Sequence, residues 1–187
     1  MLLLVICIME IIFNQHVSFC SGVCHIKSFS SFLNKIQSVS EKYDVVVQAL
    51  NGSLIAGFNH INFATEKAFK NFKNNTNEAN DLGVEIMRLA SGNSQINKSF
   101  SIGLTEGEND CLFVIVGSSD ESVKKAFDLL SEIVSMDGFD NFLDRSNENE
   151  IIKYFNITKE EICATDLSKN TIEDLVIERV ALTDFLK

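Results

Sequence analysis

The sequence predicts an α+β fold in which a mixed β-sheet is packed with helices and is followed by a helical C-terminal part. Apolar, β-branched runs such as CLFVIV at residues 111–116 are typical of buried strands. Between such runs lie segments whose apolar residues recur every three or four positions, as they do in amphipathic helices. Strands and helices alternate in the middle of the chain, but a hairpin at its start and several helices at its end break a regular βαβ order.

The first half of the chain is expected to hold a hairpin, one further strand and two helices. Strand-like residues interrupted by a short turn predict the hairpin, and a β-branched run further on predicts an inner strand. Apolar residues at helical spacing predict the helices, the second with a stripe that includes Ile61 and Ala68. The predicted hairpin covers residues 10–13 and 16–24, the strand 45–49, the helices 28–39 and 59–72, and a polar connection 71–80.

The second half is expected to begin with a strand over residues 84–90 that carries Arg88 and ends at a turn. A short helix over 94–100, a loop over 103–109 and a buried strand over 111–116 follow. Three later helices start at sequences that resemble capping boxes, in which a Ser or Thr oxygen accepts from an amide three residues on. These pairs are Ser118 with Glu121, Thr158 with Glu161, and Thr171 with Asp174.

Composition points to one domain, over residues 9–187, in a chain of 187 residues with 45% apolar residues. The formal net charge is −10. A protein that binds nucleic acid over a wide surface needs many Lys and Arg residues to displace counterions, so this chain is not expected to do so. Any RNA contact must be local, or shared with a basic partner.

The N-terminal MLLLVICI lacks the basic residues that precede the apolar core of a signal peptide. We expect residues 1–8 to be an extension upstream of the true start at Met9, or disordered. The alternative is an export signal, which would give meaning to four N-x-S/T sequons. The odd number of cysteines, five, favours reduced and mostly buried thiols in a cytoplasmic protein.

Metal binding is not expected. His16, Cys20 and Cys24 would share one face of a strand while His25 points away, and no C-x-x-C pair accompanies them. No cofactor motif of the P-loop or GxGxxG type occurs, and no Ser-His-Asp or Cys-His set can be recognised. We therefore predict a non-enzyme without catalytic residues. The rival hypothesis is a small stand-alone hydrolase or transferase that uses the region of His60 and Arg88.

A polar cluster between residues 60 and 98 is the candidate binding site. Exposed amides at a turn can hold a phosphate, glycine lets the backbone come close, and Lys or Arg adds charge. Alternatively, the turn only caps the next helix and a backbone carbonyl satisfies His60. The candidate RNA-binding residues are His60, Lys67, Arg88, Ser91, Gly92, Asn93, Gln95 and Lys98.

The last helix, from Thr171 to Leu186, is apolar on more than one face. Such a helix is either deeply buried or covered by a partner. Its Leu175 and Leu182 are the candidate anchors.

Several short motifs resemble one family in their order and spacing. They are Ala56-Gly57-x-x-His60, Glu66-Lys67-Ala68, Val84-Glu85-Ile86, Ala90-Ser91-Gly92-x-x-Gln95-Ile96 and Leu175-x-x-Glu178-Arg179-x-Ala181-Leu182. On these residues the chain resembles the small kinase-binding subunit of the KEOPS complex, of the archaeal type. Ser94 departs from the pattern, because a basic residue often stands before the Gln of this motif.

The resemblance implies a non-catalytic subunit of the complex that makes N6-threonylcarbamoyladenosine in tRNA. Such a subunit binds the complex's atypical kinase, here through Leu175, Arg179 and Leu182, and meets the other KEOPS subunits indirectly. It also implies recruitment of tRNA by its single-stranded 3′ CCA end, which is read by stacking and local hydrogen bonds. Such local reading agrees with the acidic net charge.

Overall fold

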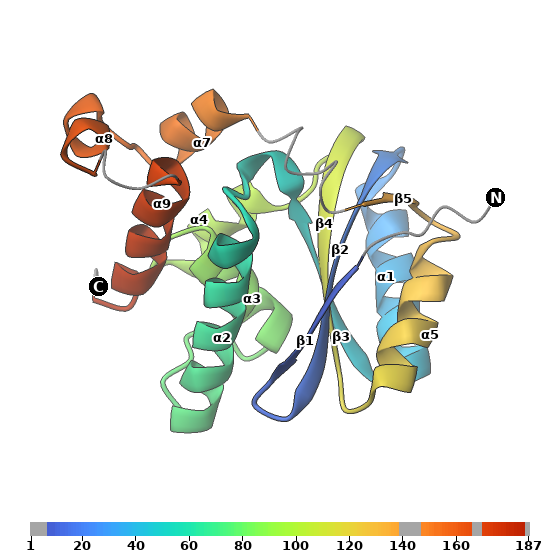
Figure 1. Cartoon of the computed structure of the whole chain (residues 1–187). Coiled ribbons are helices and arrows are strands. Elements are labelled where there is room, and N and C mark those ends of the chain that lie inside the picture. Colours follow the sequence, from blue (N-terminus) through green and yellow to red (C-terminus); the bar gives the residue numbers. More distant parts are fainter. Residues whose placement is uncertain (1–6, 139–146, 166–169, 186–187) are drawn as a thin grey trace. The chain divides into compact units, whose positions relative to one another are not determined.

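The computed structural model describes residues 7–138, 147–165 and 170–185 of the chain (Figure 1). Its backbone contacts divide the chain into two compact units, each built from two segments. The first unit comprises residues 1–52 and 104–144, and the second comprises 53–103 and 145–187. The first unit contains the sheet and the second is helical, which confirms the α+β class and the helical C-terminal part. None of the helices among the described residues is long and apolar enough to span a membrane.

The sheet of the first unit has the strand order β1-β2-β4-β3, and β5 pairs with the remaining part of β2. Every pairing between described strands is antiparallel, although a mixed sheet was expected. The reason is that β4 lies between β2 and β3 and runs against both. The run at 45–49 is therefore a terminal strand in this order and not an inner one. The strands are β1 (Ile8–Ile12), β2 (Gln15–Ile26), β3 (Val45–Asn51), β4 (Gly107–Gly117) and β5 (Ser135–Asp137).

The predicted hairpin is confirmed as β1 and β2. Phe13 and Asn14 form its two-residue loop, and both have positive φ angles, 50° and 64°. Two such residues in a row are the geometry of a turn whose twist matches that of the flanking strands. Of the N-terminal extension 1–8, residues 1–6 lie outside the described residues, whereas Ile8 pairs with Phe19.

Helices α1 (Phe29–Tyr43) and α5 (Asp120–Leu130) lie on one face of the sheet (Figure 1). Alternate residues of β2 and β4 point to this face, because side chains alternate along a strand. The resulting core contains Cys20, Cys24 and Ile26 from β2, Cys111, Phe113 and Ile115 from β4, Phe32, Ile36 and Val39 from α1, and Val123, Ala126 and Leu130 from α5. The predicted helix over 28–39 and buried strand over 111–116 are thus confirmed.

The second unit consists of helices. Its helices are α2 (Phe58–Asn74), α3 (Leu82–Ala90), α4 (Ile96–Ser99), α7 (Glu148–Tyr154), α8 (Lys159–Thr165) and α9 (Thr171–Leu182), with the short 3-10 turn η2 (Phe100–Ile102). A second 3-10 turn, η1 (Gly52–Leu54), begins at the last residue of the preceding segment of the first unit. Helix α2 confirms the second predicted helix, and α4 confirms the short one after the turn. A small core joins α7 and α9 through Ile151, Phe155, Leu175 and Val176.

The strand predicted over residues 84–90 is wrong, because this segment is helix α3. Asp81 begins the helix, since its Oδ1 accepts a hydrogen bond from the Val84 amide at 2.9 Å. Glu85 and Arg88 are three residues apart, a spacing that brings side chains together on a helix but separates them to opposite faces of a strand. Arg88 therefore lies on a helix, and the turn at 91–93 joins two helices.

The three predicted capping boxes have different outcomes. The box of Thr158 and Glu161 is confirmed, because the Thr158 amide donates to Glu161 and the Glu161 amide donates to Thr158 Oγ1. For α5 the cap is one residue later than predicted, at Ser119, which accepts from the Ser122 amide. Thr171 is already helical in α9, and the cap position belongs to Asn170.

Candidate functional site

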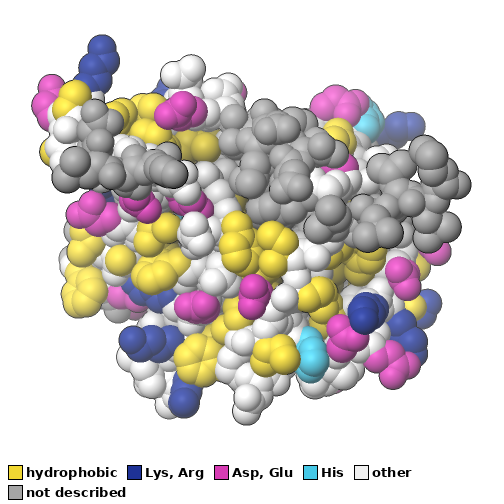
Figure 2. Space-filling view, in the orientation of Figure 1, with side chains coloured by type: hydrophobic (Ala, Val, Ile, Leu, Met, Phe, Trp, Pro, Cys, Tyr) yellow, Lys and Arg dark blue, Asp and Glu magenta, His cyan; other side chains and the backbone are white. Residues whose placement is uncertain are grey.

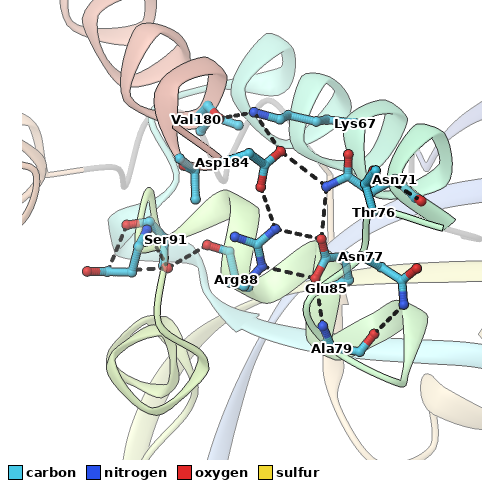
Figure 3. A network of polar contacts seen from close by, with 12 residues as sticks. Lys67, Asn71, Thr76, Asn77, Ala79, Glu85, Arg88, Ser91, Val180 and Asp184 are labelled. Carbon is cyan, nitrogen blue, oxygen red and sulfur yellow. Dashed lines mark hydrogen bonds and ion pairs between the residues drawn. The ribbon is translucent and has the colours of Figure 1, made fainter. Parts of the chain in front are cut away.

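A buried ion cluster lies within the second unit (Figure 3). We define the ion cluster as Lys67 and Asn71 of α2, Glu85 and Arg88 of α3, and Asp184, which follows α9. Two cations and two anions make the cluster neutral. The side chains of Glu85 and Arg88 are fully buried, and those of Lys67 and Asp184 are largely buried.

Glu85 and Arg88 form a bidentate pair. Arg88 Nε donates to Glu85 Oε2 at 2.9 Å, and Arg88 Nη2 donates to Glu85 Oε1 at 2.6 Å. Two parallel bonds of this kind are the strongest geometry available to a guanidinium and a carboxylate. The same Nη2 also donates to Asp184 Oδ1 at 2.8 Å, so that α3 holds the residue that follows α9.

Lys67 holds the C-terminal end of α9 directly. Its Nζ donates to the carbonyl oxygens of Val180 at 2.8 Å and Ala181 at 2.6 Å, and it pairs with Asp184 at 3.2 Å. The last carbonyls of a helix have no partner within the helix, and a cation there also meets the negative end of the helix dipole. The ion cluster therefore fixes the end of α9 against α2 and α3.

The carboxylates of the ion cluster are held in their charged form. Burial alone would raise the pKa of Glu85, but hydrogen bonds from Arg88, Asn71 and the Ala79 amide outweigh it and lower the pKa below 4.5. The pKa of Asp184 is likewise lowered, because Arg88, Asn71 and Lys67 more than offset its burial. Carboxyl groups with lowered pKa values stabilise the fold at neutral pH, and that stabilisation is lost as the pH falls through the folded-state pKa.

His60 is buried in the interior of the second unit. Its Nδ1 accepts from the Ala56 amide at 3.1 Å, and its Nε2 donates to the Ala90 carbonyl at 2.9 Å. Burial lowers the pKa of His60 to about 4, although the Ala90 carbonyl opposes the shift. Both ring nitrogens are thus occupied by backbone groups, and the bond to the Ala90 carbonyl confirms the alternative in which a backbone carbonyl satisfies His60. This leaves His60 no nitrogen for proton transfer, and no observation favours the hydrolase or transferase hypothesis.

Glu173 of α9 supports the start of α2, a role that the sequence did not suggest. Its carboxylate accepts from the His60 amide at 3.1 Å and from Asn59 Nδ2 at 3.3 Å. A carboxylate at a helix N-terminus satisfies unpaired amides and meets the positive end of the dipole. Gly57, which precedes α2, makes room for it, because a Cβ at this position would collide with the Glu173 carboxylate.

The turn after α3 presents the remaining candidate RNA-binding residues. Ser91 is buried and donates to the Arg88 carbonyl at 2.7 Å, and Asn93 Nδ2 donates to the Ser91 carbonyl at 3.0 Å. Gly92 has a φ of 65°, a conformation that favours glycine. Beyond the turn, Gln95 and Lys98 are exposed. These two side chains are available at the surface, whereas His60, Arg88 and Ser91 are internal.

The candidate kinase-binding residues of α9 have different environments. Leu175 is 4% exposed and belongs to the core with Val176, whereas Leu182 is 43% exposed. Arg179 lies between these extremes and pairs with Glu161 of α8 at 2.5 Å. Phe185, one turn beyond Leu182, is 81% exposed. Figure 2 shows hydrophobic side chains at the surface where Figure 1 places the C-terminal end of α9.

The outer face of α9 has two chemically distinct halves. Asp174, Glu178 and Leu182 are four residues apart and exposed, so they form one stripe along the helix. The first half of this stripe is acidic, and the second half, with Leu182 and Phe185, is apolar. We call Glu178, Leu182 and Phe185 the α9 surface. The ion cluster holds the end of the helix on which this surface lies.

The sequence identified the two cations of the ion cluster but not its anions. Glu85 stood within a motif that was interpreted as a strand, and Asp184 is 96 residues from its partner Arg88. The spacing of Glu85 and Arg88 was the one local signal for their pairing on a helix.

Comparison with known families identifies the family of this chain. The family profile described as kinase binding protein CGI-121 matches residues 24–184. The chain belongs to this family. The match covers most of both compact units, including the ion cluster and, of the α9 surface, Glu178 and Leu182. A search of curated individual proteins found no match.

Proposed function

We propose that this chain is the non-catalytic, kinase-binding subunit of a cytoplasmic KEOPS complex. In that complex it would bind the atypical kinase and recruit tRNA through its 3′ CCA end, while a separate subunit forms threonylcarbamoyladenosine. Membership of the CGI-121 kinase-binding family is the observation that carries the proposal. Binding of the tRNA end would orient the distant anticodon loop, so the contribution of this chain is positioning and not chemistry.

The α9 surface is the proposed contact for the kinase. Leu182 and Phe185 expose apolar area next to acidic Glu178. Apolar anchors surrounded by charge are typical of protein interfaces, where a few residues supply most of the binding energy. Leu175 would contribute through the core that supports the helix, and Arg179 would contribute at the edge, next to Glu161.

Leu182→Glu tests this contact. We expect the affinity for the kinase subunit of the same organism to fall by about 2 kcal/mol or more, which is the scale of an interface hot spot, while the fold is retained. The matched control is Leu33→Glu on α1, because Leu33 has a similar exposure of 47% but lies in the first unit. Titration calorimetry with both variants measures the difference. Equal affinities for the two would refute the proposed contact.

Gln95, Lys98 and the turn at 91–93 are the proposed contacts for RNA. The internal residues His60, Arg88 and Ser91 would hold the turn in place, since their polar groups bond to the backbone and to the ion cluster. Lys67 would act in the same way, through α9. A site with so few exposed groups suits an unpaired RNA end better than a duplex.

Binding to tRNA with and without its 3′ CCA, at two salt concentrations, tests this site. We expect Lys98→Glu to weaken binding to intact tRNA and to reduce the salt dependence by about one phosphate contact. The control is Lys124→Glu, which changes an exposed lysine of α5. If the complex of this chain with the kinase binds tRNA equally well with and without CCA, recruitment through the 3′ end is refuted.

A further inference from the structure

Two cysteine thiols meet within the sheet of the first unit. The Sγ atoms of Cys24 on β2 and Cys111 on β4 lie 3.0 Å apart, and both thiols are free. In the antiparallel register Cys24 pairs with Asn109 and Gly22 pairs with Cys111, so the two cysteines are diagonal neighbours. Both side chains belong to the core under α1 and α5 (Figure 1). The sulfur atoms of a disulfide are about 2 Å apart, so the two Sγ atoms would have to approach each other by only about 1 Å to form the bond.

Both thiols are buried, but they differ in their access to a pocket. Cys24 is 8% exposed and lines a surface pocket of about 370 Å³, whereas Cys111 is 0% exposed and does not line it. A soluble reagent that enters the pocket therefore meets Cys24 first. The sulfur of Cys111 is then in position to react with whatever becomes attached to Cys24.

The pocket is bordered by charged groups of both signs. Lys27 and Lys35 contribute two lysine side chains to its lining, together with the α1 residue Ser31. Nearby, His25 is paired with Glu108 at 2.7 Å, and Glu106 accepts from the Phe29 amide at 3.1 Å. Glu106 and Glu108 keep their negative charge in these hydrogen bonds and therefore oppose an anionic reagent. The lysines are the groups in the pocket lining that attract one.

We propose that Cys24 and Cys111 form a reversible redox site that takes up a small anionic disulfide such as oxidised glutathione. The Cys24 thiolate attacks one sulfur of the reagent, which forms a mixed disulfide and releases one glutathione thiolate. The Cys111 sulfur then attacks the Cys24 sulfur and gives its proton to the departing glutathione thiolate, which forms the Cys24–Cys111 disulfide and releases the second glutathione. The protein thus loses two electrons, which reduce one oxidised glutathione to two glutathione molecules.

The product would link β2 covalently to β4 across 87 residues of sequence. Cross-links that close long loops restrict the unfolded chain most. Oxidation is therefore expected to raise the urea midpoint of unfolding, and reduction is expected to restore the original value.

Treatment of the folded chain with oxidised glutathione, followed by proteolysis and mass spectrometry, tests the site. Cys7→Ser serves as the background, because Cys7 is partly exposed and could offer a competing thiol. We expect a peptide with Cys24 linked to Cys111. Adding Cys111→Ser should instead trap glutathione on Cys24, and adding Cys24→Ser should leave Cys111 unmodified. Cys163 is exposed on α8 and should carry glutathione in every sample, which controls for the activity of the reagent.

The proposal is overturned if Cys163 reacts while Cys24 and Cys111 stay unlinked, or if the link forms only in urea. It is also overturned if Cys111 takes up glutathione in the absence of Cys24. The pocket has its own test, because Lys27→Glu with Lys35→Glu should slow the modification of Cys24 about tenfold at low salt. The matched pair Lys124→Glu with Lys125→Glu on α5 should leave that rate unchanged. Equal rates for the two double variants would exclude the lysines as the recognition element.

Discussion

Arg88→Met removes the central cation of the ion cluster. The substitution retains most of the volume of the aliphatic stem but deletes three hydrogen bonds, two to Glu85 and one to Asp184. Glu85 is fully buried and would be left with a charge that only Asn71 and the Ala79 amide still solvate. Removal of one partner of a buried ion pair costs about 3–5 kcal/mol.

Two features of Asp184 limit its share of this cost. Its side chain is partly exposed, so it can recover hydration, and it remains paired with Lys67. The penalty therefore comes chiefly from Glu85, and a second change there should relieve it. In the double variant Arg88→Met with Glu85→Leu we expect a loss of only about 1–2 kcal/mol, because a buried pair replaced by apolar side chains is often close to neutral.

Urea unfolding followed by circular dichroism measures both values. The control is Lys124→Met, which breaks an exposed ion pair with Asp120 and should cost less than about 1 kcal/mol. The slope m should be the same for all variants if only the stability changes. The reasoning is refuted if Arg88→Met costs no more than the control, or if the double variant is no more stable than the single one.

Two further predictions concern the support of α2. Between pH 7 and pH 4 the free energy of unfolding of the wild type should fall by about 3 kcal/mol more than that of His60→Gln. The reason is that the unfolded chain takes up a proton on His60 below pH 6.5, whereas folded His60 has a pKa of about 4. Equal losses for both proteins in urea unfolding would contradict this. Gly57→Ala should destabilise the chain by about 1–3 kcal/mol, because the new Cβ displaces Glu173 from the start of α2; an unchanged melting temperature would show that Glu173 has no such role.

The fold class was predictable because its signals are local. Helical spacing of apolar residues predicted α1 and α2, whereas short runs of apolar or strand-like residues predicted the hairpin and β4. Each signal lies within a single segment, and each element is found near its predicted place. Helix α3 was missed because Val84, Ile86 and the residues around them also satisfy the alternation of a half-buried strand. The helix-start signal at Asp81 distinguishes a helix from a strand here, and it lies three residues before the motif Val84-Glu85-Ile86.

The candidate site was only partly predictable, because its contacts connect distant segments. The sequence singled out Lys67 and Arg88 as cations without showing that Asp184 neutralises both. The bond between His60 and a backbone carbonyl was foreseen as an alternative, but not that the carbonyl belongs to Ala90. The support that Glu173 gives to α2 could not be predicted, since its partners Asn59 and His60 lie more than a hundred residues earlier.

Formation of threonylcarbamoyladenosine by the reconstituted complex tests the central claim most directly. The rate on a tRNA substrate should fall strongly when this chain is omitted, should recover on adding the wild type or Leu33→Glu, and should not recover with Leu182→Glu. An equal rate with and without the chain would contradict its assignment as a KEOPS subunit.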